Sequence, residues 1–457
     1  MSTLTVNNNV SLERISPKSL FSYLIGGVGD NVIYVMIVTF LMLYYTDSVG
    51  IPAATVGSIF LVTRIWDTFS DLFWGWLFDN THSRFGKFRP WLLVGGSVCA
   101  LSLIATFSIP SMPMTATITW ACISYFMLST SYTSFDVPYW ALSTVITRNP
   151  QERNRVVILT RIGATCGQWL ASIITLPLLA LFAHSWSMVA IVYGIFFFIC
   201  AVINFINVKE IQTQEKHEKH SLKVYWELLS KNTPLLVLMS FWIIINFTMS
   251  SRIGFGLYYF KYIFHSEEAL ATYLGVSTFL AFMGAIITPL LIKYMGKLNT
   301  CWISAVVSGG ICCLLFFATT LNPWLAVILN SIPTLFLGVM TVVLGAMLPD
   351  AIAWHELENN RRVEGMAFSL NLFQLKLSGA IGGAVTGYVL GLCHYIPNVQ
   401  QAAGTLLGIN ASFTLVPGIL FLLAPLILTR YPLSEKFNQQ IAQQLAQRDV
   451  LGLQEEI

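Results

Sequence analysis

Twelve apolar segments of roughly 20 residues each dominate this sequence, and about 20 residues is the length that an α-helix needs to cross a bilayer. They lie near residues 20–45, 52–78, 91–110, 117–142, 157–182, 187–206, 234–262, 269–293, 298–320, 323–348, 364–393 and 408–429. Charged residues make up 10% of the 457 residues, whereas a soluble domain carries about 25%. The sequence therefore predicts an all-α polytopic membrane protein with twelve transmembrane helices and the lipid bilayer as its surroundings.

The positive charges indicate how the helices are oriented. Most of the 25 Lys and Arg residues fall in the N-terminal tail, in the loops after even-numbered spans or in the C-terminal tail, whereas the opposite loops hold only Lys261. By the positive-inside rule both termini are predicted to be cytoplasmic. Because topology accounts for the net charge of +3, that charge does not suggest a nucleic-acid partner.

A long charged break divides the spans into six and six. We expect a cytoplasmic tail over 1–19, a six-helix half over 20–206, a linker over 207–233, a second six-helix half over 234–429 and a cytoplasmic tail over 430–457. This layout resembles the major facilitator fold, in which substrate binds near the bilayer midplane between the halves.

Two carboxylates in the second span, Asp67 and Asp71, share one helix face because they are four residues apart. A pair of acids at membrane depth is costly and usually functional. Hard cations prefer oxygen ligands, which Ser70 and Thr133 could add, so we expect a Na⁺ site at Asp67 and Asp71 or a shared proton in its place. Lys376, at similar depth in span 11, would act as a mobile countercharge that pairs with the carboxylates when the cation is absent and is released when the cation binds.

Acidic and aromatic residues in spans 1 and 4 predict a sugar site. Asp136 and Trp140 are also four residues apart, so one helix face offers a carboxylate for sugar hydroxyls and an indole for the apolar face of a pyranose. Asp30 in span 1 is a second carboxylate. Arg161 is a positively charged residue within span 5. The loop after span 2 is predicted to be a gating loop, with Asp79, Arg84, Gly86, Lys87 and Arg89 as its residues.

Several motifs together resemble the glycoside–pentoside–hexuronide cation symporters. They are Gly26-Gly27-Val28-Gly29-Asp30, Tyr44-Tyr45-Thr46-Asp47, Arg64-Ile65-Trp66-Asp67-Thr68-Phe69-Ser70-Asp71, Arg84-Phe85-Gly86-Lys87-Phe88-Arg89-Pro90-Trp91 and Asp136-Val137-Pro138-Tyr139-Trp140. The resemblance implies a cation site at Asp67, Asp71 and Thr133, a sugar site at Asp30, Asp136, Trp140 and Arg161, and a coupling role for Lys376. Ser70 and Leu72 depart from the family pattern beside the cation site, so both Na⁺ and H⁺ stay open as the coupling ion.

These features predict a secondary active transporter that couples inward cation flow to sugar uptake by alternating access. A neutral glycoside is favoured, because a substrate carboxylate would be repelled by Asp30 and Asp136 in a low-dielectric site. A hexuronide symporter of the same family is the near alternative, and a non-transporting sensor or lipid-handling protein on the same fold is another. The sequence has no nucleotide-binding loop, nucleophile elbow or metal-ligand triad, so we expect no enzyme and no cofactor. The resemblance implies a monomer in a bacterial inner membrane.

Overall fold

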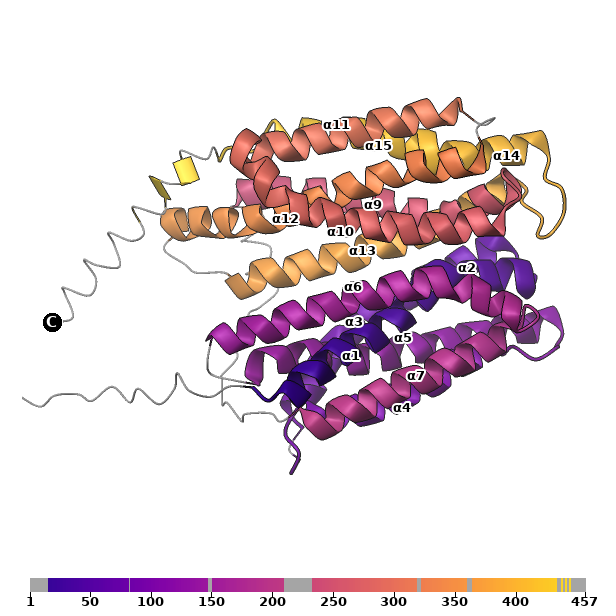
Figure 1. Ribbon diagram of the computed structural model, residues 1–457, viewed down its shortest axis with the longest axis horizontal. Coiled ribbons are helices and arrows are strands. Elements are labelled where there is room, and N and C mark those ends of the chain that lie inside the picture. The colour runs from indigo at the N-terminus through magenta and orange to yellow at the C-terminus, as the bar shows by residue number, and fades with distance from the viewer. Residues whose placement is uncertain are drawn as a thin grey trace, which may run out of the picture. The chain divides into compact units, whose positions relative to one another are not determined.

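The computed structural model describes residues 15–81, 83–146, 150–208, 232–318, 322–359, 364–433, 437–438, 440–441 and 444. Within these ranges all regular structure is helical (Figure 1). The chain divides into two compact units, Met1–Lys216 and His217–Ile457. In the described part of the chain the helices form twelve long segments, as predicted from the apolar runs.

The N-terminal unit contains six of these segments. The first combines α1 (Pro17–Val35), η2 (Met36–Phe40), α2 (Leu41–Leu43) and η3 (Tyr44–Ser48), in which η marks a π-helix. The others are α3 (Ala53–Asp79), α4 (Arg89–Thr106), α5 (Met114–Val145), α6 (Pro150–Leu181) and α7 (Trp186–Asn207). Within the unit α1 packs against α6 and α7, and α4 packs against α5 and α7.

The C-terminal unit contains the other six segments. They are α9 (Thr233–Tyr262), α10 (Glu267–Met295), α11 (Lys297–Phe316), α12 (Pro323–Asn359), α13 (Glu364–Leu392) and a last segment of α14 (Ala403–Asn410), η4 (Ala411–Leu415), α15 (Val416–Leu423) and α16 (Pro425–Leu428). Within this unit α10 lies against α12, α9 against α13 and α11 against α12 (Figure 1).

Ten of the twelve segments are long and apolar enough to cross a membrane. The two that fall short are α3, which carries Asp67 and Asp71, and α5, which carries Asp136 and many of the hydroxyls. These polar groups lower the mean hydropathy of the two helices. The predicted span 323–348 differs most from its helix, because α12 continues to Asn359. Hydropathy locates where the chain leaves the hydrocarbon, and the helix continues beyond that point through favourable residues such as Ala353 and Leu357.

Local signals explain several helix starts. Ser16 accepts a hydrogen bond from the amide of Ser19 at 3.2 Å, and Pro17 occupies the first helical position of α1. Asn232 does the same for α9, because its Oδ1 accepts from the amide of Leu235 at 2.9 Å. Both are N-cap residue types that satisfy amides lacking a partner within the helix.

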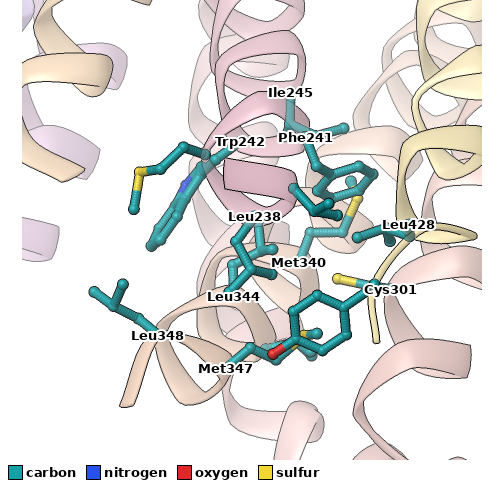
Figure 2. Packing of buried hydrophobic residues seen from close by; sticks show 14 of the residues in the cluster. Leu238, Phe241, Trp242, Ile245, Cys301, Met340, Leu344, Met347, Leu348 and Leu428 are labelled. Carbon is teal, nitrogen blue, oxygen red and sulfur yellow. The ribbon is translucent and has the colours of Figure 1, made fainter. Parts of the chain in front are cut away.

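The core of the C-terminal unit is apolar and contributed by several helices. Leu238, Phe241, Trp242 and Ile245 of α9 pack on α11, α12 and the end of the chain's last segment (Figure 2). Large apolar side chains such as Leu181 and Phe317 are also exposed on the outside of the protein. Lipid tails are as apolar as these side chains, so the packing of helices depends on close fit and polar contacts more than on excluding water.

Glycine provides this close fit between α10 and α12. A Cβ atom added at Gly284 would overlap the carbonyl oxygen of Leu335, and one added at Gly338 would overlap that of Ala281. Each glycine therefore lies against the backbone of the opposite helix, which is the approach that small residues permit in membrane proteins.

We expect Gly338→Ala to destabilise the protein by about 1–3 kcal/mol, because the added methyl must push the two backbones apart. The thermal unfolding temperature of the purified protein in detergent would measure this change. Gly345→Ala is a matched control on the same helix, because a Cβ there meets no atom within 4 Å. Equal unfolding temperatures for the two variants would contradict the importance of this close approach.

Candidate functional site

Asp67 of α3 is held by a side chain of α5 and one of its own helix. The carboxylate is only 4% exposed. The hydroxyl of Ser129 donates to it, at 2.7 Å from Oδ1 and 2.6 Å from Oδ2. Arg64, one turn earlier on α3, places its Nη1 3.7 Å from Oδ2. The negative charge is therefore anchored to two helices of the N-terminal unit.

The two hydroxyls predicted to join Asp67, one from α3 and one from α5, belong to buried residues. Ser70 donates its hydrogen to the carbonyl of Asp67 at 3.0 Å, and Thr133 donates to the carbonyl of Ser129 at 3.3 Å. Each hydroxyl has one hydrogen, so both oxygens keep lone pairs for a further partner. Oxygen lone pairs of this kind can bind a hard cation.

The second predicted carboxylate, that of Asp71, lies outside the described side chains, although its backbone continues α3. Among the side chains that the structure describes, no group of three His, Cys, Asp or Glu residues comes together. A cation at Asp67 would therefore need hydroxyl and carbonyl oxygens in addition to carboxylates.

Asp30 of α1 lies in a polar network that reaches α6. Its Oδ2 accepts from Asn31 Nδ2 at 3.3 Å, and Asn31 Oδ1 accepts from Gln168 Nε2 at 2.9 Å. Asp30 is 1% exposed. Its Oδ1 is buried without a hydrogen-bond partner. Tyr132 and Asp136 of α5 lie near enough to interact with it electrostatically.

Trp140 and Arg161 form a pair within the same unit. The Arg161 guanidinium carbon lies 4.7 Å from the Trp140 ring centroid, which is a cation–π contact. The Arg161 side chain is exposed, whereas the Trp140 side chain is half-buried. The neighbouring Tyr139 donates to the carbonyl of Tyr23 and so ties α5 to α1. The four predicted sugar-site residues thus belong to α1, α5 and α6 of one unit.

The loop after α3 is a tight turn that is bonded to α7. The amide of Gly86 donates to the Ser83 carbonyl at 3.1 Å, and Gly86 has a positive φ of 107° that favours glycine. Arg89 donates from Nη2 to the carbonyl of Phe205 at 2.7 Å, near the end of α7. Arg84 and Lys87 lie over the rings of the phenylalanines that follow them. The side chain of Asp79 lies outside the described residues, and the gating role of the loop stays a prediction.

Lys376 lies half-buried in α13 of the C-terminal unit. On the same helix Gln374 donates to Asn371 at 3.0 Å, and its Oε1 accepts from Asn246 of α9 at 3.5 Å. The predicted coupling role of Lys376 stays a prediction.

Sequence reasoning missed the partners of the predicted residues: Ser129, Tyr132, Asn31 and Gln168. Ser129 is four residues before Thr133 and seven before Asp136, so helical periodicity places all three near one face. That spacing is a usable signal, but α5 carries hydroxyls at many positions from 129 to 134. Only the packing of α3 on α5 selects Ser129 among them.

Three comparisons with known proteins agree on the class of protein. The family described as MFS/sugar transport protein matches residues 22–435. An isoprimeverose transporter of Lactiplantibacillus pentosus is 31% identical and aligns over 94% of this chain and 92% of its own length. A glucuronide carrier protein homolog of Escherichia coli (strain K12) is 28% identical and aligns over 95% of this chain and 97% of its own length.

The solved structure of the nucleoside transporter NupG has the same fold. It superposes with a TM-score of 0.66 at 12% identity, and it covers 92% of this chain and all of its own. The prediction of a membrane transporter on the major facilitator fold, and not an enzyme, is confirmed. The chain belongs to the MFS/sugar transport protein family.

Proposed function

We propose that this protein is a symporter that uses inward flow of Na⁺ or H⁺ to accumulate a neutral glycoside by alternating access. The observation that carries the sugar class is the buried Asp30 Oδ1, which has no hydrogen-bond partner. A buried polar atom without a partner is costly. A sugar hydroxyl would supply the missing donor, and Asp136 adds a second carboxylate nearby.

The pair of Trp140 and Arg161 supports a ring-shaped polar substrate. An indole offers a flat apolar surface to a pyranose, and a guanidinium offers five donors to its oxygens. Two carboxylates beside this pair disfavour an acidic sugar, because like charges repel strongly at low dielectric. One relative is named as an isoprimeverose transporter, which also supports a neutral glycoside.

Helix α5 offers a physical link between cation and sugar. Ser129 bonds to Asp67 and lies two helical turns from Asp136 on the same helix. A cation that draws on Asp67 and its hydroxyl neighbours would alter the position of α5, and with it the position of Asp136. Such a change in affinity is mutual, because linked binding equilibria are reciprocal. We propose that Lys376 takes part in this coupling, as the family resemblance implies.

The setting is also part of the proposal. The protein would act as a monomer in a bacterial inner membrane, and its sugar would be taken up toward the cytoplasm. Both termini would be cytoplasmic, because the Lys and Arg residues concentrate in the tails and in the loops on that side.

A hexuronide is the second candidate substrate, and the exposed guanidinium of Arg161 is what favours it. Arg binds carboxylates through two parallel hydrogen bonds, and one relative is named as a glucuronide carrier protein homolog. Arg161 would then have to outweigh the repulsion from Asp30 and Asp136.

Uptake into transporter-deficient membrane vesicles tests the proposal. Labelled α- and β-linked neutral disaccharides and a glucuronide would be offered under imposed Na⁺ and H⁺ gradients separately. We expect Asp30→Asn and Asp136→Asn each to weaken the affinity for the neutral sugar by at least about tenfold, because each loses hydrogen bonds to a charged acceptor.

Glu268→Gln is the control, because it removes an exposed carboxylate at the start of α10, and its uptake should match the wild type. Uptake of only the glucuronide, improved by Asp136→Asn, would assign the acidic substrate instead. Vesicles that accumulate neither sugar under either gradient would overturn the proposal that Na⁺ or H⁺ drives uptake of these sugars.

A further inference from the structure

A cavity of about 430 Å³ lies in the C-terminal unit where α10 ends and α11 begins. Its walls come from three separate stretches of the chain: the α10–α11 turn, α12 and the residues that follow α16. The cavity lies at helix ends, and none of the residues assigned to the sugar or the cation is among those that line it.

The turn side of this cavity is positively charged. Lys293 belongs to the last turn of α10, and Lys297 is the first residue of α11. No side chain among the described residues caps α11, so the amides of its first turn are left without helical partners. A helix start of this kind attracts anions, because amide hydrogens and the helix dipole both favour negative charge.

Asp350, the one acid among the described residues that line the cavity, is already compensated. Asp350 Oδ2 lies 2.6 Å from Lys297 Nζ, and it also accepts from Asn438 Nδ2 at 3.0 Å. Lys293 has no carboxylate of this kind among the residues that line the cavity. The described residues of the wall therefore retain a net positive charge.

Two residues that line the cavity, Tyr431 and Asn438, each have a buried polar atom without a hydrogen-bond partner. Tyr431 is only 8% exposed, and its hydroxyl has no hydrogen-bond partner. Asn438 Oδ1 is also buried without one. Burial, and secondarily the nearby Asp350, raises the pKa of Tyr431. The hydroxyl thus stays protonated and keeps a hydrogen to donate. Buried polar groups are nearly always satisfied in native proteins, so two in one cavity wall indicate an absent partner.

We propose that this cavity binds a phosphoryl oxyanion, held by Lys293, Lys297, the first-turn amides of α11 and the hydroxyl of Tyr431. Three phosphoryl oxygens can accept from these donors together. Asn438 Oδ1 is an acceptor, which a protonated phosphate oxygen or a headgroup hydroxyl would satisfy. The anion is either inorganic phosphate or the headgroup of a phospholipid, since a spanning helix ends at the level of the headgroups. No part of this proposal depends on sugar transport.

Thermal unfolding of the purified full-length protein in neutral detergent tests the site. Inorganic phosphate would be titrated at constant ionic strength, with chloride as the replaced anion, and a soluble short-chain phosphatidylglycerol would be titrated separately. We expect a saturable rise in the unfolding temperature with at least one of these probes, because a ligand that binds only the folded state stabilises it. A rise with phosphatidylglycerol alone would assign the headgroup, and a rise with phosphate would assign the free anion.

Two variants make the test specific. Tyr431→Phe should leave the unfolding temperature without anion unchanged or higher, because it deletes a hydroxyl that bonds to nothing, yet it should weaken anion binding about tenfold. Lys293→Gln should weaken binding similarly. Lys261→Gln is the control for the loss of one positive charge. Lys261 lies in the last turn of α9, is not among the residues that line the cavity, and bonds to Asn398.

Three results would overturn the proposal. One is that neither probe raises the unfolding temperature of the wild type. Another is that Lys261→Gln and Lys293→Gln lose the same fraction of the rise, which would indicate nonspecific charge screening. The third is that Tyr431→Phe binds the anion as tightly as the wild type. If Tyr431→Phe fails to fold, Lys293→Gln still decides the question.

Discussion

Asp67→Asn abolishes cation-driven accumulation of sugar, while passive equilibration of the same sugar across the membrane continues. This is the expected result because Asn keeps the size of the side chain and can still accept from Ser129, but it removes the negative charge. At a buried position the loss of one charge partner costs about 3 kcal/mol or more, which lowers cation affinity by on the order of 100-fold. Vesicle uptake with and without an imposed cation gradient measures both quantities.

Ser129→Ala is the graded comparison. It removes the hydroxyl that lies 2.7 Å and 2.6 Å from the two carboxylate oxygens, but it leaves the charge in place. A hydrogen bond to a charged group is worth about 1.5–3 kcal/mol. We therefore expect Ser129→Ala to require a higher cation concentration for half-maximal uptake and still to accumulate sugar. Accumulation by Asp67→Asn at the wild-type level would show that the coupling ion binds elsewhere.

The contact with Arg64 suggests a purely structural role for Asp67, and a double variant tests this role. If Asp67 serves only to neutralise Arg64, which lies 3.7 Å away, then Arg64→Gln combined with Asp67→Asn should restore accumulation. We expect no restoration, because the double variant still lacks the carboxylate that a cation requires. The unfolding temperature of each variant separates lost coupling from lost folding.

The membrane fold could be predicted from the sequence because the bilayer leaves the backbone few choices. Runs of about 20 apolar residues must satisfy their own hydrogen bonds, and this requirement locates the helices. It does not locate the π-helical stretches η2, η3 and η4, whose residues show no distinguishing composition. Hydropathy also could not show that α12 runs on to Asn359, because a helix that leaves the membrane loses its apolar signal and keeps its hydrogen bonds.

The candidate site could be predicted only one helix at a time. Spacings of four residues predicted that Asp67 shares a helix face with Asp71 and that Asp136 shares one with Trp140; the side chain of Asp71 lies outside the described residues, and both pairings stay predictions. The bonds from Ser129 to Asp67 and from Gln168 to Asn31 connect different helices. A single sequence does not show which residues of two helices lie opposite each other. Arg252 of α9 is a further charged residue within an apolar span, and it is fully buried. Its contacts in the C-terminal unit now give it a physical account.

Arg252 is a fully buried cation that ties four helical elements together. From α9, its Nη1 donates to Cys312 Sγ at 2.8 Å and to the carbonyl of Phe413 at 3.1 Å, while its Nη2 donates to the carbonyl of Asn330 at 3.0 Å. The guanidinium carbon also lies 4.6 Å from the ring centroid of Phe413. These acceptors belong to α11, η4 and α12, so one side chain joins α9 to three other elements.

We expect Arg252→Met to lower the free energy of unfolding by about 2–5 kcal/mol. Methionine fills a similar volume, but it leaves the Phe413 and Asn330 carbonyls without the donor, and a buried acceptor that loses its donor costs about 1–3 kcal/mol. Arg252→Lys should fall between methionine and the wild type, because a single ammonium cannot reach all three acceptors. A thiol-reactive fluorescent dye follows unfolding through the buried Cys301 and Cys312, above the constant signal of exposed thiols such as Cys166.

Lys261→Met on the same helix is the control, because its ammonium bonds near the surface to Asn398 and should matter little. The opposite outcome for Arg252→Met has a definite meaning. Replacing a buried charge by an apolar side chain of similar size can stabilise a protein when desolvation of the charge outweighs its bonds. An Arg252→Met protein at least as stable as the wild type would therefore show that the guanidinium is retained at a cost. The guanidinium would then be expected to serve transport, and reduced uptake by the Arg252→Met variant would show this.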